Sequence, residues 1–225
     1  MKIGIIVAME KELKLLLPLI HDVSVVTLND FRFHCGTLND HEIIAMQCGI
    51  GKVNAAIGTL TLIENFHPAL VINTGVAGGT GNASILDVVI GEEIAYHDCW
   101  CGPGTEWGAA AGCPPRFRSV PQLVELPLFN DKPHVKKGLI ASGDIFVSKK
   151  DEVDHVLNLY NGALAVDMES AAIAQVCHLK GVPVFIMRVI SDTPGGEDNI
   201  AQYENFWTDA PAATFNLLKE LIQLL

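Results

Sequence analysis

Apolar segments without polar alternation constrain the fold of this chain more than any other feature. The runs IGIIVA at 3–8, ALVIN at 69–73 and PVFIMRVI at 183–190 are apolar at nearly every position. A half-exposed strand alternates polar and apolar side chains, whereas a continuous apolar run is typical of a strand buried on both faces. The sequence therefore predicts a parallel or mixed sheet that helices cover.

Segments with helical character alternate with such runs along the chain. The expected strands are 3–8, 24–28, 32–37, 42–48, 69–73, 87–97, 137–142, 163–167 and 183–190. The expected helices are 10–20, 52–66, 151–159, 168–180 and 208–225. This alternation predicts a three-layer α/β fold, and 225 residues are enough for a single domain spanning 1–225. The Gly- and Pro-rich stretch 98–117 is expected to be a long ordered loop, which is usually functional.

Charge and composition argue against several classes of partner. The formal net charge is −11, so the chain has no electrostatic attraction for nucleic acid or for an anionic membrane. No apolar run reaches the roughly 18 residues that a membrane-spanning helix needs. No signal-peptide pattern precedes the first expected strand, and the six cysteines are expected to be reduced. We therefore expect a cytoplasmic protein.

Polar residues gather where the expected strands end. Glu12, Asp144, Glu169 and Asp192 each follow a different strand, and the strand 69–73 runs into the glycine-rich NTGVAGG. In open α/β sheets, ligands bind beyond the carboxyl ends of the strands. The sequence therefore predicts a polar cleft lined by carboxylates.

Each of these features also has an explanation that needs no ligand. Glu12 and Glu169 could be first-turn helix acids that the helix dipole favours, and Asp192 could be an N-cap or turn residue. The glycine run could be a tight turn, and it matches neither a phosphate loop nor a dinucleotide-binding motif. Because all these explanations would have to hold at one edge of one sheet, the pattern favours a ligand site.

Metal and cofactor chemistry finds little support. His97, Asp98, Cys99, Cys101 and Cys113 offer metal-ligating side chains. The C-x-C spacing with one distant cysteine is nevertheless a poor match to known zinc sites. We expect neither a metal nor a cofactor.

Seven segments together resemble one enzyme family. They are MKIGIIVAMEKEL at the start, CGIGKVNAA at 48–56, VINTGVAGG at 71–79, YHD at 96–98, SGDIFV at 142–147, AVDMESAAIAQVC at 165–177 and RVISD at 188–192. In order and spacing the chain resembles the 5′-methylthioadenosine/S-adenosylhomocysteine nucleosidases of the nucleoside phosphorylase/hydrolase superfamily. The resemblance implies a mixed, twisted sheet flanked by helices, and a homodimer. It also implies hydrolysis of the N-glycosidic bond of these adenine thionucleosides, with 5′-deoxyadenosine as a further candidate substrate, to release adenine and a thioribose.

The resemblance also assigns roles to the acids. Asp192 would protonate adenine N7, because an adenine anion is a poor leaving group. Glu12 would orient and deprotonate the attacking water. Glu169 would bind the ribose hydroxyls and place negative charge beside the ribosyl cation that forms in the transition state.

Further residues line the pocket that the resemblance implies. Phe146 would stack on adenine, and the backbone of Val147 would contact the purine edge. The residues expected around the ribose and the thioether are Met9, Ile50, Met168 and Tyr203. Those expected elsewhere in the substrate site are Val76, Ala77, Gly78 and Ser191. Met168 could instead be a core residue.

Three departures from the family pattern stand out. Asp167 occupies a position where many relatives have Glu, and we interpret it as a structural acid. Val76 replaces a Ser, which removes a hydroxyl from the site. The loop 99–116 differs from that of relatives, in which this region reaches toward the neighbouring subunit's pocket.

Three rival functions stay open at this level. A phosphorylase of the same superfamily would need arginines for phosphate, and this chain has only four, while the acids of MEKE would repel phosphate. A hydrolase acting on another adenine nucleoside, such as 6-amino-6-deoxyfutalosine, would share the adenine and ribose contacts. A binding protein without catalysis could use the same fold.

Overall fold

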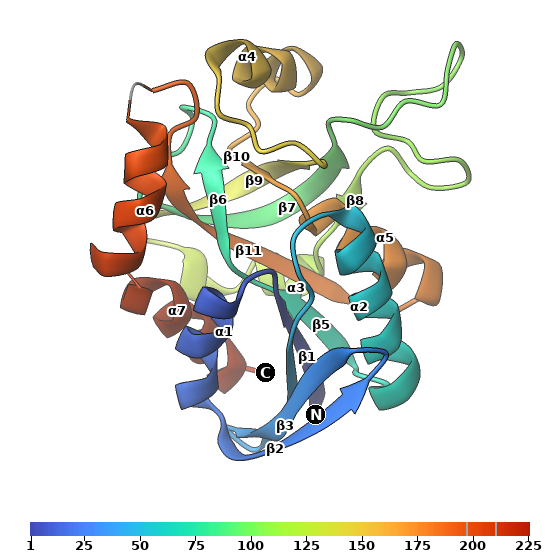
Figure 1. Cartoon of the computed structure of the whole chain (residues 1–225), viewed down its shortest axis with the longest axis vertical. Coiled ribbons are helices and arrows are strands. Elements are labelled where there is room, and N and C mark those ends of the chain that lie inside the picture. Colours follow the sequence, from blue (N-terminus) through green and yellow to red (C-terminus); the bar gives the residue numbers. More distant parts are fainter. Residues whose placement is uncertain (197, 210) are drawn as a thin grey trace.

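A computed structural model describes residues 1–196, 198–209 and 211–225, and Figure 1 shows its arrangement. Its strands are β1 (Lys2–Val7), β2 (His21–Leu28), β3 (Phe31–Leu38), β4 (His41–Gln47), β5 (Leu70–Asn73), β6 (Val76–Gly79), β7 (Val88–Tyr96), β8 (Phe117–Arg118), β9 (Val135–Ser142), β10 (Ala165–Asp167) and β11 (Val184–Asp192). They form one mixed sheet in the order β2-β3-β4-β1-β5-β11-β6-β10-β9-β7-β8. The mixed sheet agrees with the predicted fold class.

Helices cover both faces of this sheet. They are α1 (Glu10–Leu16), α2 (Lys52–Phe66), α3 (Pro121–Val124), α4 (Lys150–Leu159), α5 (Ser170–Lys180), α6 (Asn199–Asp209) and α7 (Pro211–Gln223), with 3₁₀ turns at Leu17–Leu19 and Pro127–Phe129. Helices α2 and α5 lie on one side of the sheet, and α1, α6 and α7 lie on the other (Figure 1). Separate hydrophobic clusters fill the two interfaces, so the three predicted layers are present.

Strand β11 bends the sheet back on itself. It pairs in parallel with β5 and β6 and also pairs antiparallel with β7. Strands β11, β6, β10, β9 and β7 consequently form a closed ring of pairings. Because β10 runs antiparallel to β6 and β11 runs parallel to it, β10 ends beside the carboxyl-terminal half of β11.

Local sequence explains several boundaries. Asn29 and Asp30 both have positive φ, as do Asn39 and Asp40, and these residue types adopt the left-handed turns that close two-residue hairpins. Helix α5 ends at Gly181, which has φ 67° and follows the predicted cation Lys180. Both hairpins belong to the part of the sheet that carries β2, β3 and β4.

The structure corrects several predicted boundaries. The segment Val76–Gly79 is strand β6 rather than a loop, because β10 and β11 pair with it on either side. Helix α5 begins at Ser170, so Met168 and Glu169 precede it. The expected helix 208–225 is wrong at its start, since α6 already covers Asn199–Asp209 and α7 begins at Pro211. Residue 210 lies outside the described residues. The stretch 98–116 carries no helix or strand, whereas Phe117, the last residue of the expected loop 98–117, begins β8.

Among the described residues, none of the helices has both the length and the apolar character needed to cross a lipid bilayer.

Candidate active site

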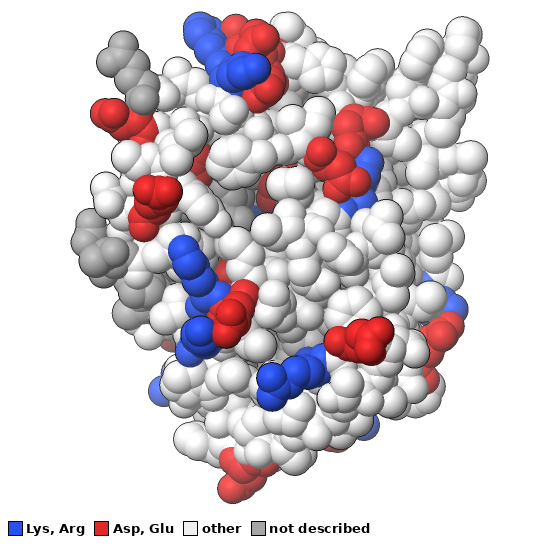
Figure 2. Space-filling view, viewed as in Figure 1, with Lys and Arg blue, Asp and Glu red and all other residues white. Residues whose placement is uncertain are grey.

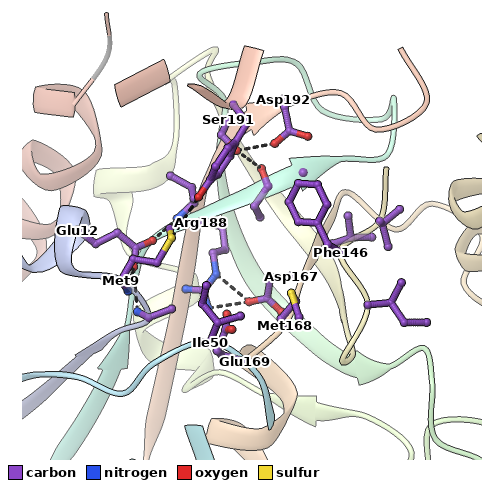
Figure 3. Close-up of a pocket in the computed structure, with 18 of the residues that line it drawn as sticks. Met9, Glu12, Ile50, Phe146, Asp167, Met168, Glu169, Arg188, Ser191 and Asp192 are labelled. Atoms are coloured by element: carbon purple, nitrogen blue, oxygen red, sulfur yellow. Dashed lines mark hydrogen bonds and ion pairs between the residues drawn. The ribbon is translucent and has the colours of Figure 1, made fainter. Parts of the chain in front are cut away.

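A pocket opens where β1, β10 and β11 reach their carboxyl ends. Its lining residues are Ala8, Met9, Glu12, Ile50, Thr74, Val76, Ala77, Gly78, Ile145, Phe146, Val147, Val166, Asp167, Met168, Glu169, Arg188, Ser191, Asp192 and Tyr203. All thirteen residues that the sequence placed in a site therefore lie around one cavity. In Figure 3, Met9 and Glu12 lie on one side of this cavity and Phe146 on the other.

The carboxylate of Glu12 is held by backbone groups alone. Its Oε2 accepts hydrogen bonds from the N–H groups of Ala8 (2.9 Å) and Met9 (2.8 Å), and its Oε1 accepts one from the N–H of Val76 (3.0 Å). The side chain is 2% exposed, and burial raises its pKa even though these donors oppose the shift. A desolvated carboxylate with a raised pKa is a stronger base than an exposed one.

Glycine at position 75 is required by this arrangement. A Cβ atom at Gly75 would lie 2.3 Å from Glu12 Oε1, which is far inside contact distance. Glu12 is also the third residue of α1, so it caps that helix and faces the pocket at the same time. Glu12 is thus a first-turn helix acid, as the explanation without a ligand proposed, and it also lines the pocket.

Glu169 does not cap the helix that follows it. Its Oε1 accepts a hydrogen bond from the N–H of Gly51, 118 residues away in sequence, at 2.8 Å. Burial, together with the nearby Asp167 carboxylate, raises the pKa of Glu169 to about 7. The N–H of Ser170, the first residue of α5, donates to the carboxylate of Asp167, and the Glu169 side chain makes no capping hydrogen bond. Glu169 is thus directed into the pocket rather than toward its own helix.

A β-bulge directs Asp192 into the same cavity. In the pairing of β11 with β6, Ile190 lies opposite Ala77 and Asp192 lies opposite Gly78, so Ser191 is an extra residue. Neighbouring side chains of a regular strand point to opposite faces, but a bulge re-aims them. Both Ser191 and Asp192 consequently line the pocket, and Ser191 Oγ donates to Asp192 Oδ1 at 2.6 Å.

Burial raises the pKa of the Asp192 carboxyl, although the Ser191 hydroxyl lowers it. The raised pKa extends the protonated form of Asp192 to higher pH than that of an exposed aspartate. Asp192 can therefore supply a proton where an exposed aspartate would already be ionised.

The sequence analysis missed Arg188 as a site residue and treated it only as a strand position. Its Nε and Nη2 donate to Asp167 Oδ2 at 2.8 and 2.6 Å, and Nη2 also donates to Asn73 Oδ1. The structural interpretation of Asp167 agrees with this pairing. An arginine in the middle of an apolar strand could have indicated this position, because a buried charge needs a buried partner of opposite charge.

The remaining walls are largely apolar. Tyr203 packs edge-on against Phe146 with ring centroids 6.1 Å apart, and its hydroxyl donates to the sulfur of Met9 at 3.1 Å. Phe146 and Ile50 are 52% and 53% exposed, so the pocket is open on their side. Such a cavity fits a flat aromatic group attached to a less polar substituent.

The charge in the pocket is predominantly negative. Among the described lining residues, Arg188 is the one cation, against four acids, namely Glu12, Asp167, Glu169 and Asp192. This balance stabilises positive charge that develops on a bound molecule. On the face in Figure 2, lysine and arginine side chains lie beside acidic ones.

No group of three or more metal-ligating side chains is assembled within the described part of the chain. The six cysteines are free thiols.

Comparison with known proteins agrees with this geometry. Residues 2–223 match the family model of the phosphorylase superfamily, so the chain is a member of that superfamily. It is also 37% identical, over 229 residues and 99% of each protein, to the 5′-methylthioadenosine/S-adenosylhomocysteine nucleosidase of Bacillus cytotoxicus. At this identity and coverage the chain belongs to the 5′-methylthioadenosine/S-adenosylhomocysteine nucleosidase family, which confirms the resemblance read from its motifs.

Solved structures give the same result. The S-adenosylhomocysteine nucleosidase of Streptococcus pyogenes, in complex with 5-methylthiotubericidin, superposes with a TM-score of 0.94 at 36% identity and covers 100% of this chain and 97% of its own. The 5′-methylthioadenosine/S-adenosylhomocysteine nucleosidase of Neisseria meningitidis, in complex with methylthio-immucillin-A, gives 0.93 at 35% identity, with coverage of 100% and 99%.

Proposed function

We propose that this chain hydrolyses the N-glycosidic bond of 5′-methylthioadenosine and S-adenosylhomocysteine and releases adenine and the thioribose. The observation that carries this proposal is the convergence of Glu12, Glu169 and Asp192 on one pocket with apolar walls. Membership of the nucleosidase family supports it. 5′-Deoxyadenosine, which has the same adenine and ribose, is a further candidate substrate.

Each acid has a task that its environment suits. Asp192, with its raised pKa, donates a proton to N7 of adenine, so that the base departs neutral. Glu12, desolvated and fixed by three N–H donors, accepts a proton from the attacking water. Glu169 binds the ribose hydroxyls, and its charge lies near the ribosyl cation.

The apolar residues hold the rest of the substrate. Phe146 stacks on the adenine ring, and the backbone of Val147 contacts its edge. Met9, Ile50, Met168 and Tyr203 surround the ribose and the thioether, while Val76, Ala77, Gly78 and Ser191 complete the wall. Excluding water from this wall strengthens the interactions of the charges inside.

Water rather than phosphate is the expected nucleophile. Arg188, the cation among the described lining residues, is already engaged by Asp167 and Asn73. Phosphate needs free donors, usually bidentate arginines, and the four acids would repel it. Adenine release should therefore proceed at the same rate with and without phosphate. Strict dependence on phosphate would contradict hydrolysis.

The preferred substrate can be tested with four nucleosides. Values of kcat/KM should be highest for 5′-methylthioadenosine and S-adenosylhomocysteine, and lower for 5′-deoxyadenosine and 6-amino-6-deoxyfutalosine. A protein that binds adenine tightly and turns over none of the four would instead be a binding protein.

We further propose that residues 1–225 act as one cytoplasmic domain that forms a homodimer. Exposed apolar side chains support the dimer: Val53 and Ile57 of α2 are 68% and 48% exposed, and Trp100 in the loop 99–116 is 51% exposed. That loop projects from the body of the molecule in Figure 1, where it could complete a partner's pocket. Light scattering of the wild type and of Val53→Glu tests this, since the variant should be monomeric.

A further inference from the structure

Three charged side chains form a cluster beside the pocket without lining it. Lys52 begins α2, Asp98 follows β7, and Asp144 follows β9, so the cluster joins three segments that are distant in sequence. The mechanism described above uses none of them.

The contacts within this cluster are short and charge-assisted. Lys52 Nζ donates to Asp98 Oδ2 at 2.7 Å, and the N–H of Asp144 donates to the same oxygen at 2.8 Å. The N–H of Lys52 in turn donates to Asp144 Oδ1 at 2.7 Å. The side chains of Lys52 and Asp98 are only 28% and 15% exposed, so solvent screens this pair less than it would a pair on the surface.

Each end of the cluster is adjacent to a residue that faces the substrate. Gly51, next to Lys52, donates its N–H to Glu169 Oε1. Asp144 directly precedes the lining residues Ile145, Phe146 and Val147. The position of the Glu169 donor and the position of the adenine wall therefore depend on the same set of contacts.

The backbone leaves little freedom at this junction. Gly51 has φ +94°, a conformation that side chains rarely adopt, and a Cβ atom there would approach Asp144 Oδ1 to 3.1 Å. The two loops thus meet at a glycine and are fixed by Asp98 on their outer side.

We propose that Asp98, acting through Lys52 and Asp144, is a positioning residue for both the ribose-binding acid and the adenine wall. Without it the segment at Gly51 and the segment 145–147 lose their common anchor. The role in catalysis rests on the proposed function, whereas the role in holding adenine does not.

Asp98→Asn tests the proposal, because the amide keeps the size of the side chain and removes its charge. We expect adenine affinity, measured by equilibrium titration, to fall about tenfold, comparable to the loss of one charge-assisted hydrogen bond. We also expect the acid limb of the pH profile of kcat/KM, which reports the ionisation of Glu169, to move to higher pH. The Gly51 N–H and Arg188 lower the pKa of Glu169, whereas burial, Asp167 and Glu12 raise it, so a weaker Gly51 contact raises it further.

Lys52→Met removes the other half of the ion pair and should reproduce both effects. The double variant should be no worse than Asp98→Asn alone, because that substitution already weakens the contact with Lys52. Asp154→Asn is the matched control: it breaks the exposed Lys150–Asp154 pair on α4 and should change neither readout. Should Asp98→Asn fail to fold, Lys52→Met carries the test.

Folded Asp98→Asn or Lys52→Met with wild-type adenine affinity and a wild-type acid limb would overturn the proposal. Additive losses in the double variant would also count against a shared contact. Failure of the proposed function looks different, because the wild type itself would then release no adenine. Adenine affinity of the variants still decides the positioning role in that case.

Discussion

The ion pair between Arg188 and Asp167 is almost completely buried: Nη2 and Oδ2 are 2.6 Å apart, and each side chain is 2% exposed. Both residues line the pocket, and Arg188 lies between Glu12 and Asp167 in Figure 3. Arg188 lowers the pKa of both of these acids, whereas Asp167 raises that of Glu169. A single buried pair therefore adjusts the pKa of two acids that line the pocket.

Asp167→Asn should destabilise the protein strongly, because it leaves the Arg188 charge buried without its partner. Loss of one member of a buried pair costs about 3 to 5 kcal/mol. Chemical denaturation measures the change in unfolding free energy. Glu64→Gln, which removes a surface pair with Lys180, should cost less than about 1 kcal/mol. Equal losses in the two variants would mean that the buried pair contributes no more than an exposed one.

Asp192→Asn should abolish adenine release and leave the fold intact, because asparagine cannot donate the proton that the leaving base needs. A substrate with a leaving group that departs without protonation, such as a p-nitrophenyl 5-methylthioriboside, should still be cleaved. The two substrates are compared in steady-state assays, with circular dichroism as the control for folding. Near-wild-type release of adenine by the variant would remove Asp192 from its role.

Glu12→Gln should lower kcat by several orders of magnitude, because glutamine cannot accept a proton from water. Glutamine keeps the shape of the side chain and one acceptor oxygen, whereas its NH2 group leaves the N–H on the other side without an acceptor. This loss lowers the stability of the fold, while the affinity of the folded variant for a substrate analogue should change little. Single-turnover kinetics combined with equilibrium binding separates the two quantities. A large loss of affinity with little change in kcat would mean that Glu12 mainly holds the substrate.

Glu169→Gln should be inactive and more stable than the wild type at alkaline pH. In the folded protein the pKa of Glu169 is raised from 4.5 to about 7, so the native state binds a proton more tightly than the unfolded chain. Stability contributed by this group is therefore lost as the pH rises from 4.5 to about 7. The variant's advantage should grow over that interval to on the order of 3 kcal/mol. Thermal melts at pH 5 and pH 8 measure it, and a constant difference would contradict the raised pKa.

Much of the architecture was predictable from local patterns. The apolar runs located β1, β5 and β11, because strands buried on both faces cannot include many polar side chains. The cation, glycine and proline after α5 located its end, because Gly181 adopts a left-handed conformation there. The acids after the strands located the pocket, although β10 and β11 run in opposite directions and meet there only because β6 lies between them.

Other features depend on contacts that are distant in sequence. Strand β6 contains two glycines and has weak strand propensity, and only pairing with β10 and β11 defines it. The bulge at Ser191 is a property of two paired strands and leaves no mark in either one alone. Partners such as Gly51 for Glu169 likewise appear only when the chain is folded.

The three backbone donors around Glu12 have a consequence for how this enzyme can change over evolutionary time. Main-chain amides do not depend on the side chains attached to them, so residues at 8, 9 and 76 are free to diverge while the base stays in place. At position 76 a valine supplies the N–H that Glu12 Oε1 accepts. Substitutions at these wall positions can therefore change substrate preference while the hydrogen bonds that hold the Glu12 carboxylate are kept.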